Sequence, residues 1–238
     1  MKRILKSIGL AFPENADELK RFDEIYNDYT LEGDVNKIDP LKILSQLNPT
    51  SQKKISKTDY HKRTVLAAEI IFKLKNEYTL GHLKLQKLMY LCQHILHMDL
   101  HTNFLKQAMG PYDPNLMRSI DKQLNSHKWF KYVKNDSPKY QSLEKAGEHK
   151  NWYEIYYKDH LIEIDFLIEK FRKIKTNRIE IIATVFACWK ELLESKQLVN
   201  ENSLVSKFYN WSEEKSKFKK EQVFKEIQWM KEEKIHPV

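Results

Sequence analysis

The sequence predicts a mainly α-helical protein, a helical bundle containing a winged-helix-like segment with one small β-hairpin. Glycine and proline are scarce, with 5 and 7 in 238 residues, whereas sandwiches and barrels need many turn residues. Apolar residues recur with helical spacing through most of the chain. One aromatic and β-branched stretch, Trp129–Lys134, interrupts that spacing and indicates a strand.

The chain is expected to comprise three parts: an N-terminal helical arm and linker at 1–57, a winged-helix-like module at 58–150, and a helical region packed on it at 151–238. Within the arm, apolar spacing predicts helices at 16–28 and 40–47. The polar stretch Asn48–Lys54 follows as a linker.

The middle part is expected to begin with helices at 59–76 and 82–98, followed by QAMGPYDPNL and a third helix at 114–126. Gly110 and Pro111 are expected to turn the chain, because glycine tolerates positive φ and proline fixes φ. Asp113 suits the N-cap of the third helix and Pro114 its first position, where a carboxylate accepts free N–H groups and proline sacrifices no hydrogen bond.

Two short strands around the turn cluster NDSP predict a hairpin that begins at Trp129. Its wing would carry Lys131, Lys134 and Lys139, and Leu143–Gly147 is expected to start another helix. The remaining chain is expected to be helical, with helices at 161–173, 179–193, 203–209 and 219–232.

The chain carries a net charge of +8, and most of it lies in residues 61–160, where 16 Lys/Arg face 10 Asp/Glu for a net +6. A basic segment fits a nucleic-acid or an acidic protein partner. The alternative is an ordinary lysine-rich surface. Basic residues beside aromatics would contact phosphates, and the third helix would read bases. The candidate DNA-binding residues are Arg118, Lys122, Gln123, Lys131, Lys134 and Lys139; a solvated helix face is the alternative for those on the helix.

Localisation is expected to be cytoplasmic, without membrane contact. No apolar run approaches the roughly 20 residues of a membrane span, and the basic N-terminus lacks the apolar stretch of a secretory signal. Cys92 and Cys188 both fall in apolar helical patterns, which predicts buried thiols.

No catalytic motif is present: the sequence lacks a P-loop, GxGxxG and GxSxG. We therefore expect no enzyme activity and no cofactor. His94, His97 and His101 are weak metal candidates that would align only on a helix continuing to residue 101, and DLHTN indicates a helix exit. A metal-dependent nuclease remains a second alternative, based on the helical acids Glu163, Asp165 and Glu169, which otherwise form a solvated helix face.

Two segments together resemble a known family. KLQKLMYLCQ (84–93) is similar to the KLQKLLYFAQ-type helix of the Panacea (antitoxin-like) domains, in which a Gly-Pro segment leads into the next helix, as Gly110 and Pro111 do here. A longer set is similar to a domain found with type I restriction specificity subunits: GPYDPNL, LEKAGEHK (143–150), IEIIATVFACWKELL (179–193) and FYNWSEEKSKF (208–218).

The resemblance implies a bacterial toxin–antitoxin or phage-defence setting, in which the protein neutralises a partner toxin by binding it. Tyr112 and Tyr90 are the candidate partner contacts. The alternative is a DNA-binding component of a restriction-modification or autoregulatory system. The parts before residue 60 and after residue 150 are both substantial, and the resemblance assigns no toxin-contacting residues to them.

Overall fold

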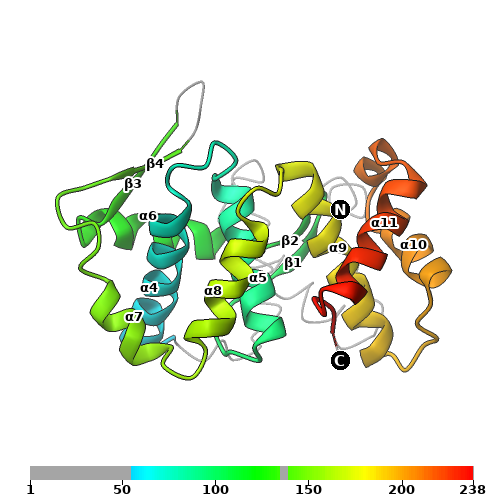
Figure 1. Cartoon of the computed structure of the whole chain (residues 1–238), viewed down its shortest axis with the longest axis horizontal. Coiled ribbons are helices and arrows are strands. Elements are labelled where there is room, and N and C mark those ends of the chain that lie inside the picture. Colours follow the sequence, from blue (N-terminus) through cyan, green and yellow to red (C-terminus); the bar gives the residue numbers. More distant parts are fainter. Residues whose placement is uncertain (1–54, 135–138, 238) are drawn as a thin grey trace, which may run out of the picture. The chain divides into compact units, whose positions relative to one another are not determined.

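A computed structural model describes residues 55–134 and 139–237 of the chain. The expected helices at 16–28 and 40–47 lie outside this part. The described residues contain eight α-helices and two small antiparallel hairpins, so the fold is mainly α, as the sequence predicts (Figure 1). No described helix has the length and apolarity to cross a membrane.

Residues 56–238 form one compact unit. Its helices are α4 (Lys57–Leu74), α5 (His82–Ile95), α6 (Pro114–Ser126), α7 (Lys150–Tyr156), α8 (Leu161–Phe171), α9 (Thr176–Glu194), α10 (Glu201–Tyr209) and α11 (Lys220–Glu232), with a 3₁₀ turn at Glu213–Lys217. The strands are β1 (Leu105–Gln107), β2 (Gly110–Tyr112), β3 (Phe130–Val133) and β4 (Lys139–Ser142).

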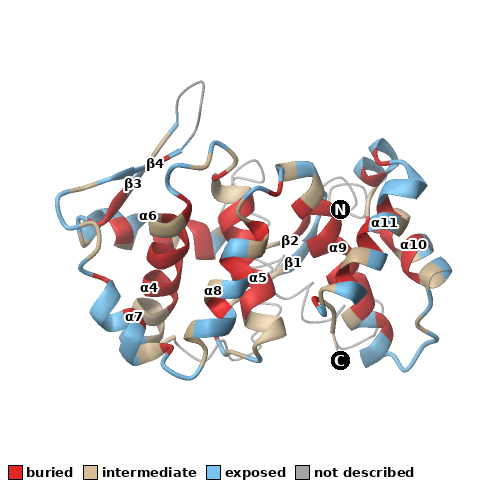
Figure 2. Ribbon diagram, viewed as in Figure 1, coloured by how far each residue is buried: buried red, intermediate tan, exposed pale blue. Residues whose placement is uncertain are grey.

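The core is continuous across residue 150. Helix α4 packs against α6, α7 and α8, while α5 packs against α8 and α9. Helix α9 also contacts α10, α11 and β2, and is therefore buried on most sides, as its nearly uniform apolar sequence predicts. Figure 2 shows buried residues concentrated in α4, α5 and α9, with exposed residues along α7 and the hairpin β3–β4.

Helix α6 and the hairpin after it follow the predicted order. Asp113 Oδ1 accepts a hydrogen bond from the Leu116 N–H at 2.9 Å, and Pro114 is the first helical residue, so the predicted cap is confirmed. Strands β3 and β4 pair in antiparallel register. Tyr132 and Tyr140 face each other, and His82 stacks on the Tyr132 ring with the centroids 3.5 Å apart, which holds the hairpin against the start of α5.

Two local predictions were wrong. Gly110 and Pro111 do not form the turn: they belong to β2, and the chain reverses at Ala108 and Met109. A second hairpin, β1–β2, therefore exists beside the expected one. The stretch Leu143–Gly147 also starts no helix, since Gly147 adopts a φ of +110° and α7 begins only at Lys150.

Candidate functional site

Residues of α5 and α9 hold the hairpin β1–β2 in place. Gly110 has a φ of +95°, and a Cβ atom there would lie 2.6 Å from Thr184 Oγ1 and 3.2 Å from Lys87 Nζ. Only glycine combines that φ with so close an approach. Lys87 Nζ in turn donates a hydrogen bond to the Pro111 carbonyl at 2.5 Å, which ties β2 to α5.

Lys87 belongs to a buried charge cluster. Burial lowers the pKa of its ammonium group to about 7, assisted by the nearby Lys215, while Glu180 opposes the shift. Glu180 is itself fully buried and accepts hydrogen bonds from Lys215 Nζ at 2.7 Å and Lys217 Nζ at 3.0 Å. The Glu180 carboxylate thus pairs with the ammonium groups of Lys215 and Lys217. Such partners are needed because a buried charge without one is costly.

Further hydrogen bonds hold the turn of the hairpin and the two chain segments that flank its strands. Trp211 Nε1 donates to the Gln107 carbonyl at 2.7 Å, and Ser212 Oγ donates to the Ala108 carbonyl at 3.0 Å. Asp113 Oδ2 accepts from the Asn103 N–H at 2.8 Å. The same carboxylate that caps α6 therefore closes the base of the hairpin, and the hairpin presents a rigid wall.

That wall borders a groove between α5 and α9, which we call the α5–α9 groove. It consists of two adjoining hollows of about 260 and 440 Å³ that share Gln93, His94, Lys190 and Glu194. The smaller hollow is further lined by the rings of Tyr90, Phe104, Pro111 and Trp211, and the larger by Ile95, Phe186, Leu193 and His236. Each hollow combines apolar rings with charged side chains of both signs.

The Tyr90 and His94 rings of this groove are uncharged near neutral pH. Burial lowers the pKa of His94 to about 4, with Lys190 contributing in the same direction. Burial also raises the pKa of Tyr90, whose ring meets the His94 ring edge-on with the centroids 4.5 Å apart. Lys190 Nζ and Glu194 Oε1 form an ion pair at 2.5 Å on the same side of α9. The Lys190–Glu194 ion pair of the groove thus belongs to α9, and the neutral rings of Tyr90 and His94 belong to α5.

The two candidate partner contacts occupy different environments. Tyr90 is only 4% exposed and forms part of the groove floor. Tyr112 is half-buried at the end of β2 and lines neither hollow of the groove.

The three histidines considered for a metal do not converge. Helix α5 ends at Ile95, so only His94 lies on it, and both His97 and His101 adopt positive φ. The two ring nitrogens of His101 instead face carboxylates: Nε2 lies 3.4 Å from Asp59 Oδ2, and Nδ1 lies 3.3 Å from Asp99 Oδ1. Within residues 55–134 and 139–237, no group of three or more His, Cys, Asp or Glu residues is arranged to hold a metal ion.

The candidate DNA-binding residues separate into two sets. Arg118 and Lys122 are exposed on α6, but Gln123 turns inward, where its Oε1 accepts from Thr64 Oγ1 at 3.0 Å. Lys131 and Lys139 are exposed on the hairpin face opposite Tyr132 and Tyr140, because side chains alternate along a strand. Lys134, also exposed, directly follows β3.

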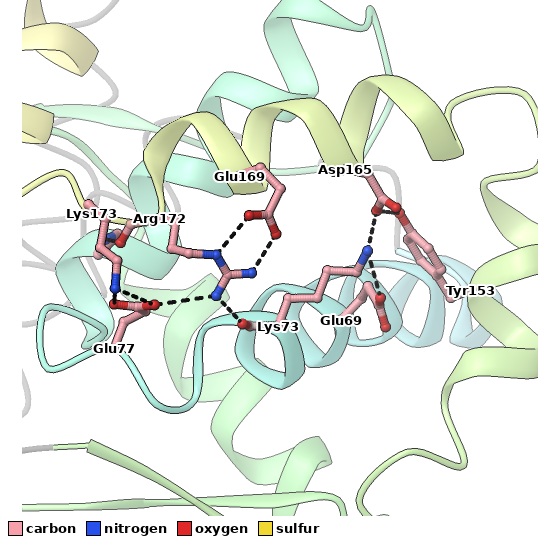
Figure 3. A network of polar contacts seen from close by, with 9 residues as sticks. Glu69, Lys73, Glu77, Tyr153, Asp165, Glu169, Arg172 and Lys173 are labelled. Carbon is pink, nitrogen blue, oxygen red and sulfur yellow. Dashed lines mark hydrogen bonds and ion pairs between the residues drawn. The ribbon is translucent and has the colours of Figure 1, made fainter.

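Two of the three acids considered for a nuclease take part in a polar network that joins α4 to α8 (Figure 3). Lys73 Nζ lies 2.6 Å from Asp165 Oδ1 and 3.5 Å from Glu69 Oε1. At the other end, Arg172 binds both oxygens of Glu169. These carboxylates pair with cations, whereas Glu163 is exposed on the first turn of α8.

Arg172 extends this network to the end of α4. Its Nη1 donates to the Lys73 carbonyl at 2.7 Å and lies 3.4 Å from Glu77 Oε1 (Figure 3). Hydrogen bonds from Lys173 and Arg172 lower the pKa of Glu77. The network thus satisfies a carbonyl at the C-terminus of α4 that has no partner within that helix.

The two thiols are buried, as the sequence predicts. Burial raises the pKa of Cys92 and of Cys188 to about 12. A thiol with so high a pKa contains almost no thiolate at neutral pH, and the thiolate is the nucleophile.

Sequence reasoning missed the buried charges of Lys87, Glu180 and Lys215 and the groove residues Lys190 and Trp211. One signal was present. Lys84 and Lys87 stand three residues apart among apolar positions of α5, so they share a helix face with Leu88 and Leu91. A lysine within an apolar face predicts either a snorkelling side chain or a buried, hydrogen-bonded ammonium group.

In comparisons with known proteins, no family model matches the chain and no curated protein matches it.

Proposed function

We propose that the protein is a non-enzymatic bacterial binding protein of the antitoxin type, which acts by binding a toxin or phage-defence protein in the α5–α9 groove. The observation that carries the proposal is the position of this groove. It lies where the two segments with Panacea-like sequence, 84–93 and 110–114, come together.

The groove has features that suit a protein partner. Aromatic side chains are enriched at the centres of protein interfaces, where they contribute most binding energy. Tyr90, Phe104 and Trp211 line the smaller hollow; Phe104 is half-buried, whereas Tyr90 and Trp211 are 4% and 8% exposed. Lys190 and Glu194 offer charges of both signs for selecting a partner. The hairpin is held by hydrogen bonds from α5 and from residues 211–212, so little ordering is needed on binding.

The test is co-expression and co-purification with the product of the neighbouring gene. We expect a stable complex and restored growth when that product is toxic. Lys190→Glu places two acids together on α9 and is expected to weaken the complex by about tenfold or more, as for a charge reversal inside an interface. Lys225→Glu is the matched control, because Lys225 is exposed on α11 and outside the groove. Absence of a complex, or equal effects of the two reversals, would contradict the proposal.

DNA binding is a second candidate, favoured by the outward position of Lys131 and Lys139 on the β3–β4 hairpin. Phosphate contacts make affinity fall steeply with salt, by about 0.9 in the logarithmic slope for each phosphate neutralised. Replacing Lys131, Lys134 and Lys139 by glutamine should reduce that slope for the protein's own promoter DNA, whereas replacing Lys219 and Lys220 should not. An unchanged slope, or no binding at low salt, would eliminate this candidate.

A further inference from the structure

A second hollow lies at the base of the β3–β4 hairpin and shares no lining residue with the α5–α9 groove. Its volume is about 490 Å³, within the range of small-molecule sites. Four rings line it: His61 of α4, His127 and Trp129 between α6 and β3, and Trp152 of α7. We call it the aromatic hollow.

The rings of the aromatic hollow are held in a defined arrangement. His127 stacks on Trp129 with centroids 4.6 Å apart and planes inclined by 19°. His61 meets Trp152 edge-on at 5.2 Å, and its Nδ1 lies 3.0 Å from the Tyr156 hydroxyl. Trp152 is 46% exposed, so part of its ring is open to solvent.

The hollow itself carries little net charge. Burial lowers the pKa of His61, with His127 adding to the effect, and burial likewise lowers the pKa of His127, so both rings are mainly neutral at pH 7. At the rim, Lys128 pairs with Glu144 at 2.5 Å and Lys145 pairs with Glu148 at 3.4 Å. A planar, uncharged aromatic group therefore fits it better than a simple anion.

The surroundings are basic. Lys131 and Lys139 extend outward from the same hairpin, and neither forms an ion pair with any residue that the structure describes. Lys62 of α4 lies nearby, with its Nζ 5.8 Å from the centre of the Tyr156 ring, which contacts both His61 and Trp152. Residues 61–160 carry a net +6, from 16 Lys/Arg against 10 Asp/Glu. This charge disfavours a cationic ligand, although aromatic cages elsewhere bind quaternary ammonium groups.

We propose that the aromatic hollow binds an unstacked base of a single-stranded nucleic acid whose phosphates follow the lysines of the β3–β4 hairpin. Proteins that bind single strands combine aromatic stacking surfaces with a basic track in this way. A base in a duplex is already stacked and paired, and cannot enter the hollow without being extruded. The proposal does not rest on protein binding in the α5–α9 groove. It shares the hairpin lysines with the duplex-binding candidate and differs from it in its ligand and in the use of the aromatic hollow.

The test is fluorescence anisotropy of the full chain with a labelled single-stranded oligodeoxythymidine at low salt. Trp152→Ala is expected to weaken binding by ~5- to ~150-fold, the usual effect of removing one stacking ring. Phe166→Ala is the matched control, since Phe166 is 47% exposed on α8 and outside the hollow. Trp152→Phe retains a ring and should keep most of the affinity, which separates stacking from any effect of Trp152→Ala on folding.

Two further comparisons identify the ligand and the site. The single strand should bind more tightly than the duplex of the same sequence, and Lys190→Glu in the α5–α9 groove should leave this binding unchanged. The proposal is overturned if the wild-type protein does not bind the oligonucleotide at low salt. It is also overturned if the duplex binds as well as the single strand, or if Trp152→Ala and Phe166→Ala have equal effects.

Discussion

Replacing Gly110 by alanine is expected to destabilise the protein by about 2–6 kcal/mol. Two costs add. A side chain at a φ of +95° strains the backbone by about 1–3 kcal/mol. The new Cβ atom would also lie 2.6 Å from Thr184 Oγ1 and 3.2 Å from Lys87 Nζ, so either β2 or these side chains must move. Overpacking of this kind costs about 1–3 kcal/mol.

The two costs can be separated with variants that the chain itself offers. Gly147 has a φ of +110°, but a Cβ there would meet only Phe72 Cε2, at an ordinary 3.7 Å. Gly147→Ala therefore carries the backbone strain without the clash. Thr184→Ala removes the nearest clashing atom, and combining it with Gly110→Ala should recover about 1 kcal/mol or more of the loss.

Urea unfolding followed by far-ultraviolet circular dichroism measures these differences. We expect Gly110→Ala to lose more stability than Gly147→Ala, and the double variant to be more stable than the sum of the single changes predicts. If Gly110→Ala costs no more than Gly147→Ala, or if Thr184→Ala gives no recovery, the close packing of the hairpin against α5 and α9 does not limit this position.

Three other predictions concern stability and reactivity. Asp113→Ala removes the acceptor of the Leu116 and Asn103 N–H groups and should lower the free energy of unfolding by about 1–2 kcal/mol, whereas Asp113→Asn should lower it less. Thermal melting measures both variants. An unchanged melting temperature in Asp113→Ala would refute the cap. Lys87 has a pKa of about 7 in the folded protein, whereas its ordinary value is 10.5. Between these two pH values the unfolded chain binds more protons than the folded protein. The free energy of unfolding should therefore increase by up to about 1.4 kcal/mol per pH unit as the pH rises through this window. Lys87→Met should remove that gain; equal pH dependence of the two proteins in urea unfolding would show that Lys87 is not its source. Finally, Cys92 and Cys188 should resist a thiol reagent in the native protein and react in denaturant, and rapid labelling of the folded chain would contradict their burial.

The predictable parts of the fold are those encoded by local signals. Helix α6 begins at the predicted residue because Asp113 and Pro114 act within one turn of the helix. Helix α9 and the strand at Phe130–Val133 follow from composition over a few residues. The end of α5 was placed three residues late, at Met98 instead of Ile95, since apolar residues continue past the helix and no glycine or proline marks its end.

The hairpin β1–β2 could not be predicted in the same way. Its three-residue strands carry no regular alternation of apolar and polar residues, and no residue of β1 is buried. What holds it comes from distant parts of the chain: Lys87, Thr184 and Trp211. The same reason hid the groove, because Tyr90 and His94 meet Lys190 and Trp211 only after α5, α9 and the segment after α10 have packed together.

The two sides of the hairpin β1–β2 differ in how far along the chain their partners lie. Lys87 is 24 residues from Pro111, whereas Trp211 is 104 residues from Gln107. Contacts between nearby residues form early in folding, and those that close long loops form late. During synthesis the hairpin can therefore pack on α5 well before residues 211 and 212 leave the ribosome. Until then the carbonyls of Gln107 and Ala108 lack the partners that Trp211 and Ser212 later supply. We expect a nascent chain that stops before residue 211 to be more open to proteolysis at this hairpin than the finished protein.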